Sequence, residues 1–189
     1  MSLYAVQAVL VLDNEGNRIL AKYYSPSSPT AVKSPLVAAP VKEQKAFEKK
    51  LVQKTKGVNG DILLMDKHLV VYKQTADVLI YLVCPPEENE ALVYQALVTL
   101  RDSVDAMLDH QVDKTFLVAH YDRLALVVDE IIDNGIILAT EKRSIVARTT
   151  IEAEEEPSLQ NLDIGEKGFK GVFDFAAGRL AQAVRQQLG

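Results

Sequence analysis

Apolar residues occur first in a run of strand length at the start of the chain. Leu3–Leu12 is almost continuously apolar, which is typical of a central strand covered on both faces. Asp13–Asn17 follows with Asp, Asn and Gly, residue types that tolerate turn conformations, and Arg18–Tyr24 has the pattern of a second strand. The pattern predicts an antiparallel hairpin.

Three more strand-like runs lie in the middle of the chain, at Asp61–Met65, His68–Lys73 and Val78–Val83. They are separated by two polar breaks, Asp66-Lys67 and Gln74–Asp77, which are short enough for hairpins. Sequential hairpins predict an antiparallel sheet.

Apolar residues recur at helical spacing around these strands. Val41–Thr55 places four residues on one line and lysines on the other sides, so we expect a helix on a sheet face. The four residues are Gln44, Phe47, Leu51 and Thr55. A longer stripe predicts a second helix of about five turns. This stripe consists of Leu92, Val93, Ala96, Leu97, Leu100, Val104, Met107 and Leu108.

The helical pattern continues over Lys114–Ile132, with a break expected near His120. We interpret Asn134-Gly135 as the C-terminal stop of this helix, because both residues accept a positive φ. Helices with one apolar face each predict layers against the sheet, and therefore an α/β fold of the α+β type.

Composition divides the chain into one domain and a tail. Residues 1–150 are expected to form the domain, with a flexible insert without regular structure at residues 25–40, where four prolines stand among Ser and Ala. Residues 151–165 begin near a run of glutamates and are expected to form an acidic linker. Residues 166–189 are predicted to form a C-terminal amphipathic helix, which either packs on its own domain or binds a partner.

Composition and charge restrict the class of protein. Of 189 residues 48% are apolar, yet no run approaches the roughly 20 apolar residues of a membrane span. The start lacks a basic secretory signal, and Cys84 is a single cysteine that we interpret as a packed apolar residue, so we expect a cytoplasmic protein. A net charge of −5 argues against a nucleic-acid partner. The first 60 residues nevertheless hold nine Lys and Arg against four Asp and Glu.

Residues that could carry chemistry are scattered along the chain. His68, His110 and His120 lie far apart, and neither an HExxH nor a CxxC motif occurs. Asp129 and Glu130 are neighbours in sequence and project about 100° apart on a helix, which argues against a metal site. We therefore expect no catalytic residue, no cofactor, no metal and no enzymatic activity.

Four runs, taken in their order along the chain, resemble the zeta-subunit family of coatomer, the COPI vesicle coat. They are QAVLVLDNEGNRILAKYY (Gln7–Tyr24), VKEQKAFEKKLVQKT (Val41–Thr55), DILLMDKHLVVYKQTADVLIYLV (Asp61–Val83) and LVVDEIIDNGIIL (Leu126–Leu138). The resemblance covers Tyr4 to Arg148 and departs from the family pattern at residues 25–40, which are longer than expected. It implies a longin-like fold, a five-stranded antiparallel sheet flanked by helices, as in the sigma chains of clathrin adaptors.

The same resemblance implies a non-catalytic function. Such a protein is a small subunit of COPI coatomer, binds the trunk of the gamma-type large subunit and joins the other coatomer subunits. An Arf-type GTPase recruits the complex, so the chain is expected in the cytoplasm, peripheral on Golgi membranes and COPI-coated vesicles. Its processes would be Golgi-to-ER retrograde and intra-Golgi transport. A clathrin-adaptor sigma-type chain and another longin-type trafficking module are the alternatives.

Two sets of residues are candidates for partner contact. By analogy with sigma chains, the first strands and the second helical stripe would bind the large subunit, and the candidate residues of the stripe are Leu92, Leu97, Leu100 and Val104. The basic side of the 41–55 helix is interpreted as a contact for anionic lipid or an acidic partner, or as a solvated helix face. Its candidate residues are Lys42, Lys45 and Lys49.

Overall fold

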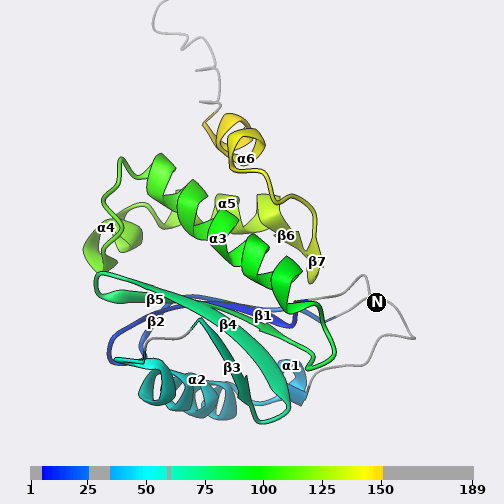
Figure 1. Cartoon of the computed structure of the whole chain (residues 1–189). Helices are drawn as coiled ribbons and strands as arrows, with labels where there is room; N and C mark the ends of the chain where they lie inside the picture. Colours follow the sequence, from blue (N-terminus) through cyan, green and yellow to red (C-terminus); the bar gives the residue numbers. More distant parts are fainter. Residues whose placement is uncertain (1–5, 26–34, 59–60, 151–189) are drawn as a thin grey trace, which may run out of the picture. The chain divides into compact units, whose positions relative to one another are not determined.

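The computed structural model describes residues 6–25, 35–58 and 61–150. It contains a sheet of five antiparallel strands with helices on both faces (Figure 1). The strands are β1 (Ala8–Asp13), β2 (Arg18–Tyr23), β3 (Ile62–Met65), β4 (His68–Thr75) and β5 (Val78–Cys84). Their order across the sheet is β2-β1-β5-β4-β3, and all neighbouring pairs are antiparallel. The predicted five-stranded antiparallel sheet is confirmed.

β1 is a central strand, because it pairs with β2 on one side and with β5 on the other. All six of its residues are buried. Val9 and Val11 belong to the core on one face of the sheet, while Leu10 and Leu12 belong to the core on the other face, as strand alternation requires. Burial on both faces explains why this part of the sequence is continuously apolar.

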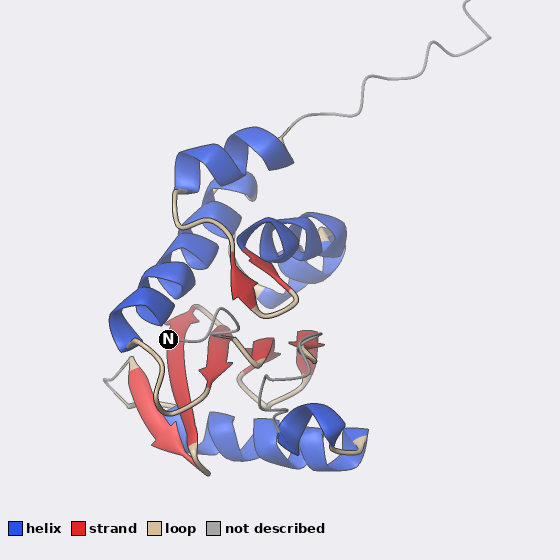
Figure 2. Ribbon diagram, turned by 90° about the vertical axis from the view of Figure 1, so that its right-hand side faces the viewer, coloured by secondary structure: helices blue, strands red, loops and turns tan. Residues whose placement is uncertain are grey.

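Helices cover both faces of the sheet. They are α2 (Val41–Thr55), α3 (Glu90–Met107), α4 (Lys114–Ala119) and α5 (Tyr121–Ile131), and a further helix, α6 (Lys142–Thr149), packs on α3 and α5. α2 lies on one face and α3 and α5 lie on the other, as two views at right angles show (Figures 1 and 2). The predicted break at His120 is confirmed, since its φ of −116° and ψ of 40° separate α4 from α5.

The segment Asn134-Gly135 forms a hairpin turn, and its interpretation as a helix stop is wrong. α5 ends at Ile131, and a short hairpin of β6 (Ile132–Asp133) and β7 (Ile136–Ile137) follows. Asn134 has a φ of 48° and Gly135 a φ of 84°. Positive φ at both central residues is the requirement of the two-residue hairpin turn that Asn-Gly favours.

A short helix lies within the segment that was predicted to be irregular. α1 (Pro35–Ala38) forms beside α2, where Leu36 packs against the core and its carbonyl accepts a hydrogen bond from Gln44 Nε2 at 3.1 Å. The prediction is therefore wrong for residues 35–38. Residues 26–34, the predicted linker at 151–165 and the predicted helix at 166–189 lie outside the described residues.

Candidate interaction surfaces

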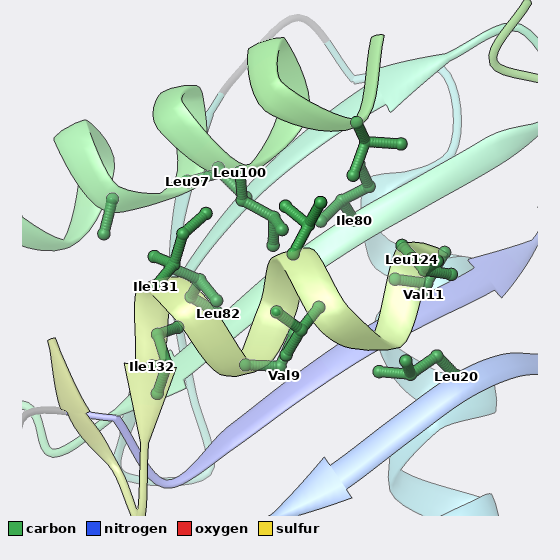
Figure 3. Packing of buried hydrophobic residues seen from close by; sticks show 14 of the residues in the cluster. Val9, Val11, Leu20, Ile80, Leu82, Leu97, Leu100, Leu124, Ile131 and Ile132 are labelled. Atoms are coloured by element: carbon green, nitrogen blue, oxygen red, sulfur yellow. The ribbon is translucent and has the colours of Figure 1, made fainter. Parts of the chain in front are cut away.

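The apolar stripe of α3 faces the chain's own core. Leu97 and Leu100 are fully buried and Val104 is 1% exposed. Figure 3 shows Leu97 and Leu100 directed toward sheet residues such as Ile80. The expectation that these three residues contact a partner therefore needs correction, because helical spacing identifies a buried face without showing what buries it. Of the four residues, Leu92 is 40% exposed and remains a candidate.

Large apolar side chains are exposed on β3, which is an edge strand. Ile62 is 46% exposed and Leu64 is 67% exposed. The N–H of Tyr72 in β4 donates to the carbonyl of Asp61 at 2.9 Å, and strand alternation then directs the backbone N–H and C=O of Ile62 and Leu64 toward the open side of the sheet. An edge of this kind is a template for a strand from another chain.

Ion pairs hold both ends of β3 in place. Lys73 Nζ donates to Asp61 Oδ2 at 2.8 Å, and the Tyr94 hydroxyl of α3 donates to the same oxygen at 3.1 Å. The Lys73 bond in particular holds the pKa of Asp61 below its usual value. At the other end, Lys50 Nζ of α2 donates to both carboxylate oxygens of Asp66, at 2.9 and 2.7 Å, which lowers the pKa of Asp66. An anchored edge loses less conformational freedom when a partner binds.

The sheet-facing side of α2 contains a charged residue in addition to the predicted line of Gln44, Phe47, Leu51 and Thr55. Glu48 is fully buried, beside the predicted buried line of the helix. Arg18 of β2 donates through Nε to Glu48 Oε2 and through Nη2 to Oε1, both at 2.7 Å, and the Tyr23 hydroxyl donates to Oε1 at 2.6 Å. The position was visible in the pattern, because Glu48 lies four residues after Gln44 and three before Leu51.

The opposite side of α2 is a lysine surface. Lys42, Lys45 and Lys49, the predicted candidates for lipid or acidic-partner contact, are all exposed there. Figure 1 shows α2 on the outside of the sheet, on the face away from α3 and α5. The three residues thus share one accessible face of the molecule.

The side chains that could have been reactive or metal-binding are buried or paired with other residues. Cys84 is buried, and desolvation raises the pKa of its thiol. Asp129 pairs with Lys22, and Glu130 pairs with Arg148 at 3.1 Å. Across residues 6–25, 35–58 and 61–150, no group of three His, Cys, Asp or Glu side chains is arranged to hold a metal, and no helix is long and apolar enough to cross a membrane.

The fold defines a class of small proteins with a five-stranded antiparallel sheet between helices. Comparison with known proteins identifies the family: residues 5–156 match the one described as clathrin adaptor complex small chain. The sequence is 41% identical to coatomer subunit zeta of Saccharomyces cerevisiae over 188 residues, which are 100% of this chain and 98% of that protein. It is 39% identical to human coatomer subunit zeta-1 over 156 residues, 82% of each chain.

A structural comparison shows the same fold. The small chain aligns with a TM-score of 0.57 and 19% sequence identity to a chain of a structure described as a homology model of the full-length AP-3 complex in a stretched open conformation. The match covers 76% of this chain and 90% of that chain. The protein therefore belongs to the clathrin adaptor complex small chain family, and within it to the coatomer zeta subunits.

Proposed function

We propose that the chain is the small, non-catalytic subunit of the COPI coatomer. The observation that carries this proposal is the 41% identity to a coatomer zeta subunit along the whole chain. The described surface supports a binding function, because it offers an apolar strand edge and a charged helix face. The names of the relatives favour coatomer over a clathrin-adaptor sigma-type chain or another longin-type module.

The direct partner in this proposal is the trunk of the gamma-type large subunit. A stable interface has an apolar centre and buries about 1,200–2,000 Å² in total. Ile62 and Leu64 on the anchored edge strand are large apolar residues that fit such a centre, and Leu92 is a further candidate on α3. The other coatomer subunits join through the complex.

The cellular setting follows from membership of the coat. In this proposal the assembled complex is recruited from the cytoplasm by an Arf-type GTPase and becomes peripheral on Golgi membranes and COPI-coated vesicles. The chain then supports Golgi-to-ER retrograde and intra-Golgi transport as a structural part of the coat.

Saccharomyces cerevisiae allows a direct test, because its coatomer subunit zeta is the 41% identical relative. A tagged copy of the full chain, expressed in cells depleted of that relative, is expected to be recovered with the gamma-type subunit and the other coatomer subunits. Quantitative mass spectrometry of the recovered complexes measures their ratios. Recovery with the large subunits of a clathrin adaptor in place of coatomer would contradict the proposal.

A further inference from the structure

The outer face of α2 carries more positive charge than the sequence count suggests. The helix contains two acidic residues, Glu43 and Glu48, in addition to its lysines. Glu48, however, faces the sheet and forms an ion pair with Arg18. Only Glu43 remains on the exposed side of the helix. The exposed lysines in and directly after α2 are Lys42, Lys45, Lys49, Lys50, Lys54 and Lys56.

Most of these lysines are not neutralised by the protein itself. Lys50 pairs with Asp66, and Lys56 Nζ donates to the Asn14 carbonyl at 3.5 Å. Within the part of the chain that the structure describes, Lys42, Lys45, Lys49 and Lys54 form neither an ion pair nor a hydrogen bond through their side chains. Lys54 nevertheless acts electrostatically on Asp66, whose pKa it helps to lower, so the ammonium groups of Lys42, Lys45 and Lys49 are the ones available to an external partner.

The arrangement of the charges is linear. Lys42, Lys45 and Lys49 follow one another at spacings of three and four, so they lie along one line of the helix, opposite the buried Leu51. Lys42 and Lys49 are seven residues apart, so the row is about 10 Å long at the helical rise per residue. The result is a straight basic row, which fits an extended anionic surface better than a small ligand.

The residue types on this face distinguish between a membrane and a protein as the partner. Protein interfaces are depleted in Lys and enriched in aromatic residues, Met and Arg, which supply the residues that dominate binding energy. Between the lysines, the outer face exposes Ala46 and Gln53, and its single large apolar residue is Val41 at the first position. Lysine is a hydrated point charge, which suits a diffuse layer of headgroups.

We propose that the outer face of α2 rests on a bilayer surface and binds anionic phospholipid headgroups through Lys42, Lys45 and Lys49. The contact is peripheral, because the face lacks the apolar stripe that an inserted amphipathic helix needs. This inference goes beyond membership of a coat and does not depend on it, since the contact is made by this chain alone.

Vesicle sedimentation with the full chain tests the proposal. We expect the chain to bind phosphatidylcholine vesicles that contain about 30 mol% phosphatidylserine, and not vesicles of phosphatidylcholine alone. Binding should fall severalfold when NaCl is raised from about 50 mM to about 200 mM, because salt screens exposed charges. Each lysine near the surface strengthens binding by roughly fivefold, so K42E/K45E/K49E should weaken it by at least about tenfold.

The matched control is R123E/K142E/R143E, which makes the same change in net charge with exposed residues of α5 and α6. It should weaken vesicle binding by less than about threefold, since these residues lie away from α2. Equal losses in the two triple variants, or no binding of the unchanged chain at about 50 mM NaCl, would overturn the proposal. It is also overturned if K42E/K45E/K49E keeps vesicle binding but loses the gamma-type trunk, because α2 then binds an acidic protein surface.

Discussion

Arg18 of β2 and Glu48 of α2 form a bidentate ion pair. Arg18 Nε lies 2.7 Å from Glu48 Oε2, and Nη2 lies 2.7 Å from Oε1. Glu48 is fully buried, and the hydroxyl of Tyr23 donates a third hydrogen bond to its carboxylate, so this buried group is hydrogen-bonded within the protein. The pair lies on the sheet-facing side of α2, as does the buried Leu51, while Lys42, Lys45 and Lys49 are exposed on the opposite side.

Replacing Glu48 should destabilise the fold. Glu48→Ala leaves the Arg18 guanidinium, which is 25% exposed, without its counter-ion, and the expected loss is about 3 kcal/mol of unfolding free energy. Urea unfolding measures it. Glu43→Ala on the exposed side of the same helix is the control, with an expected change within about 0.5 kcal/mol. Equal effects of the two substitutions would show that the buried pair does not stabilise the fold.

Asp13 should make stability dependent on pH in the acid range. Burial alone would raise the pKa of Asp13, but hydrogen bonds from Lys114 Nζ at 2.8 Å, from the Asn17 side chain and from the N–H groups of Asn17 and Glu15 hold it well below the usual 3.8. The folded state thus prefers the carboxylate. Its contribution is present above the ordinary pKa and is lost as the pH falls toward the folded value.

The test compares Asp13→Asn with the unchanged chain by urea unfolding at several pH values. The variant should be less stable by about 1 kcal/mol near neutral pH, and this difference should shrink between about pH 5 and pH 3. Asp109→Asn, at an exposed loop position, is the control and should show no such convergence. A difference that is constant over the whole range would contradict the role of the Asp13 carboxylate.

A glycine at position 135 should be required for stability, because the β6–β7 turn closely approaches the segment before β1. A Cβ at this position would lie 2.5 Å from the carbonyl oxygen of Val6, whose own N–H donates to the Gly135 carbonyl at 2.9 Å. Gly135→Ala adds this clash to the strain of a φ of 84°, so we expect a loss of at least about 2 kcal/mol in thermal or chemical unfolding.

Gly57 provides the matched control for this substitution. Its φ is 75°, but an added Cβ would meet nothing within 4 Å. Gly57→Ala should therefore cost only the backbone strain, about 1 kcal/mol. If the two variants were equally stable, the close approach of Val6 to the turn would not contribute to stability.

The β3 edge should contribute to binding of the large subunit. Ile62→Asp combined with Leu64→Asp places charge on two exposed apolar positions and should weaken binding of the gamma-type trunk by at least about tenfold, with little change in stability. Val118→Asp with Leu126→Asp is the control, because these exposed residues lie on α4 and α5. Affinities follow from titration calorimetry. If the β3 variant binds normally, the interface lies elsewhere on the chain.

The sequence predicts the helices and strands of this fold better than it predicts which surfaces they pack against. The continuous apolar run of β1, the line of Leu51 on α2 and the break at His120 are local patterns, and the structure confirms them. Alternation and helical spacing act over a few residues, so they identify buried faces directly. They also identified the buried line of α3, but they did not show that Leu97 packs on the chain's own sheet.

What the sequence did not predict depends on contacts between distant residues. Glu48 is buried because Arg18 lies 30 positions earlier on a strand that passes beneath α2. Ile62 and Leu64 are exposed because β3 lies at the edge of the sheet, a property of strand order. Asn134-Gly135 is a different case, because Asn-Gly by itself favours a two-residue hairpin turn. The helical pattern before it led to the incorrect interpretation as a helix stop.

The most direct test of the central claim is co-expression of the full chain with the trunk domain of a gamma-type coatomer subunit, followed by size-exclusion chromatography with light scattering. The account predicts a one-to-one complex that persists at high salt, because its interface is centred on apolar residues such as Ile62 and Leu64. A chain that remains monomeric and elutes separately from the trunk at both moderate and high salt would contradict it.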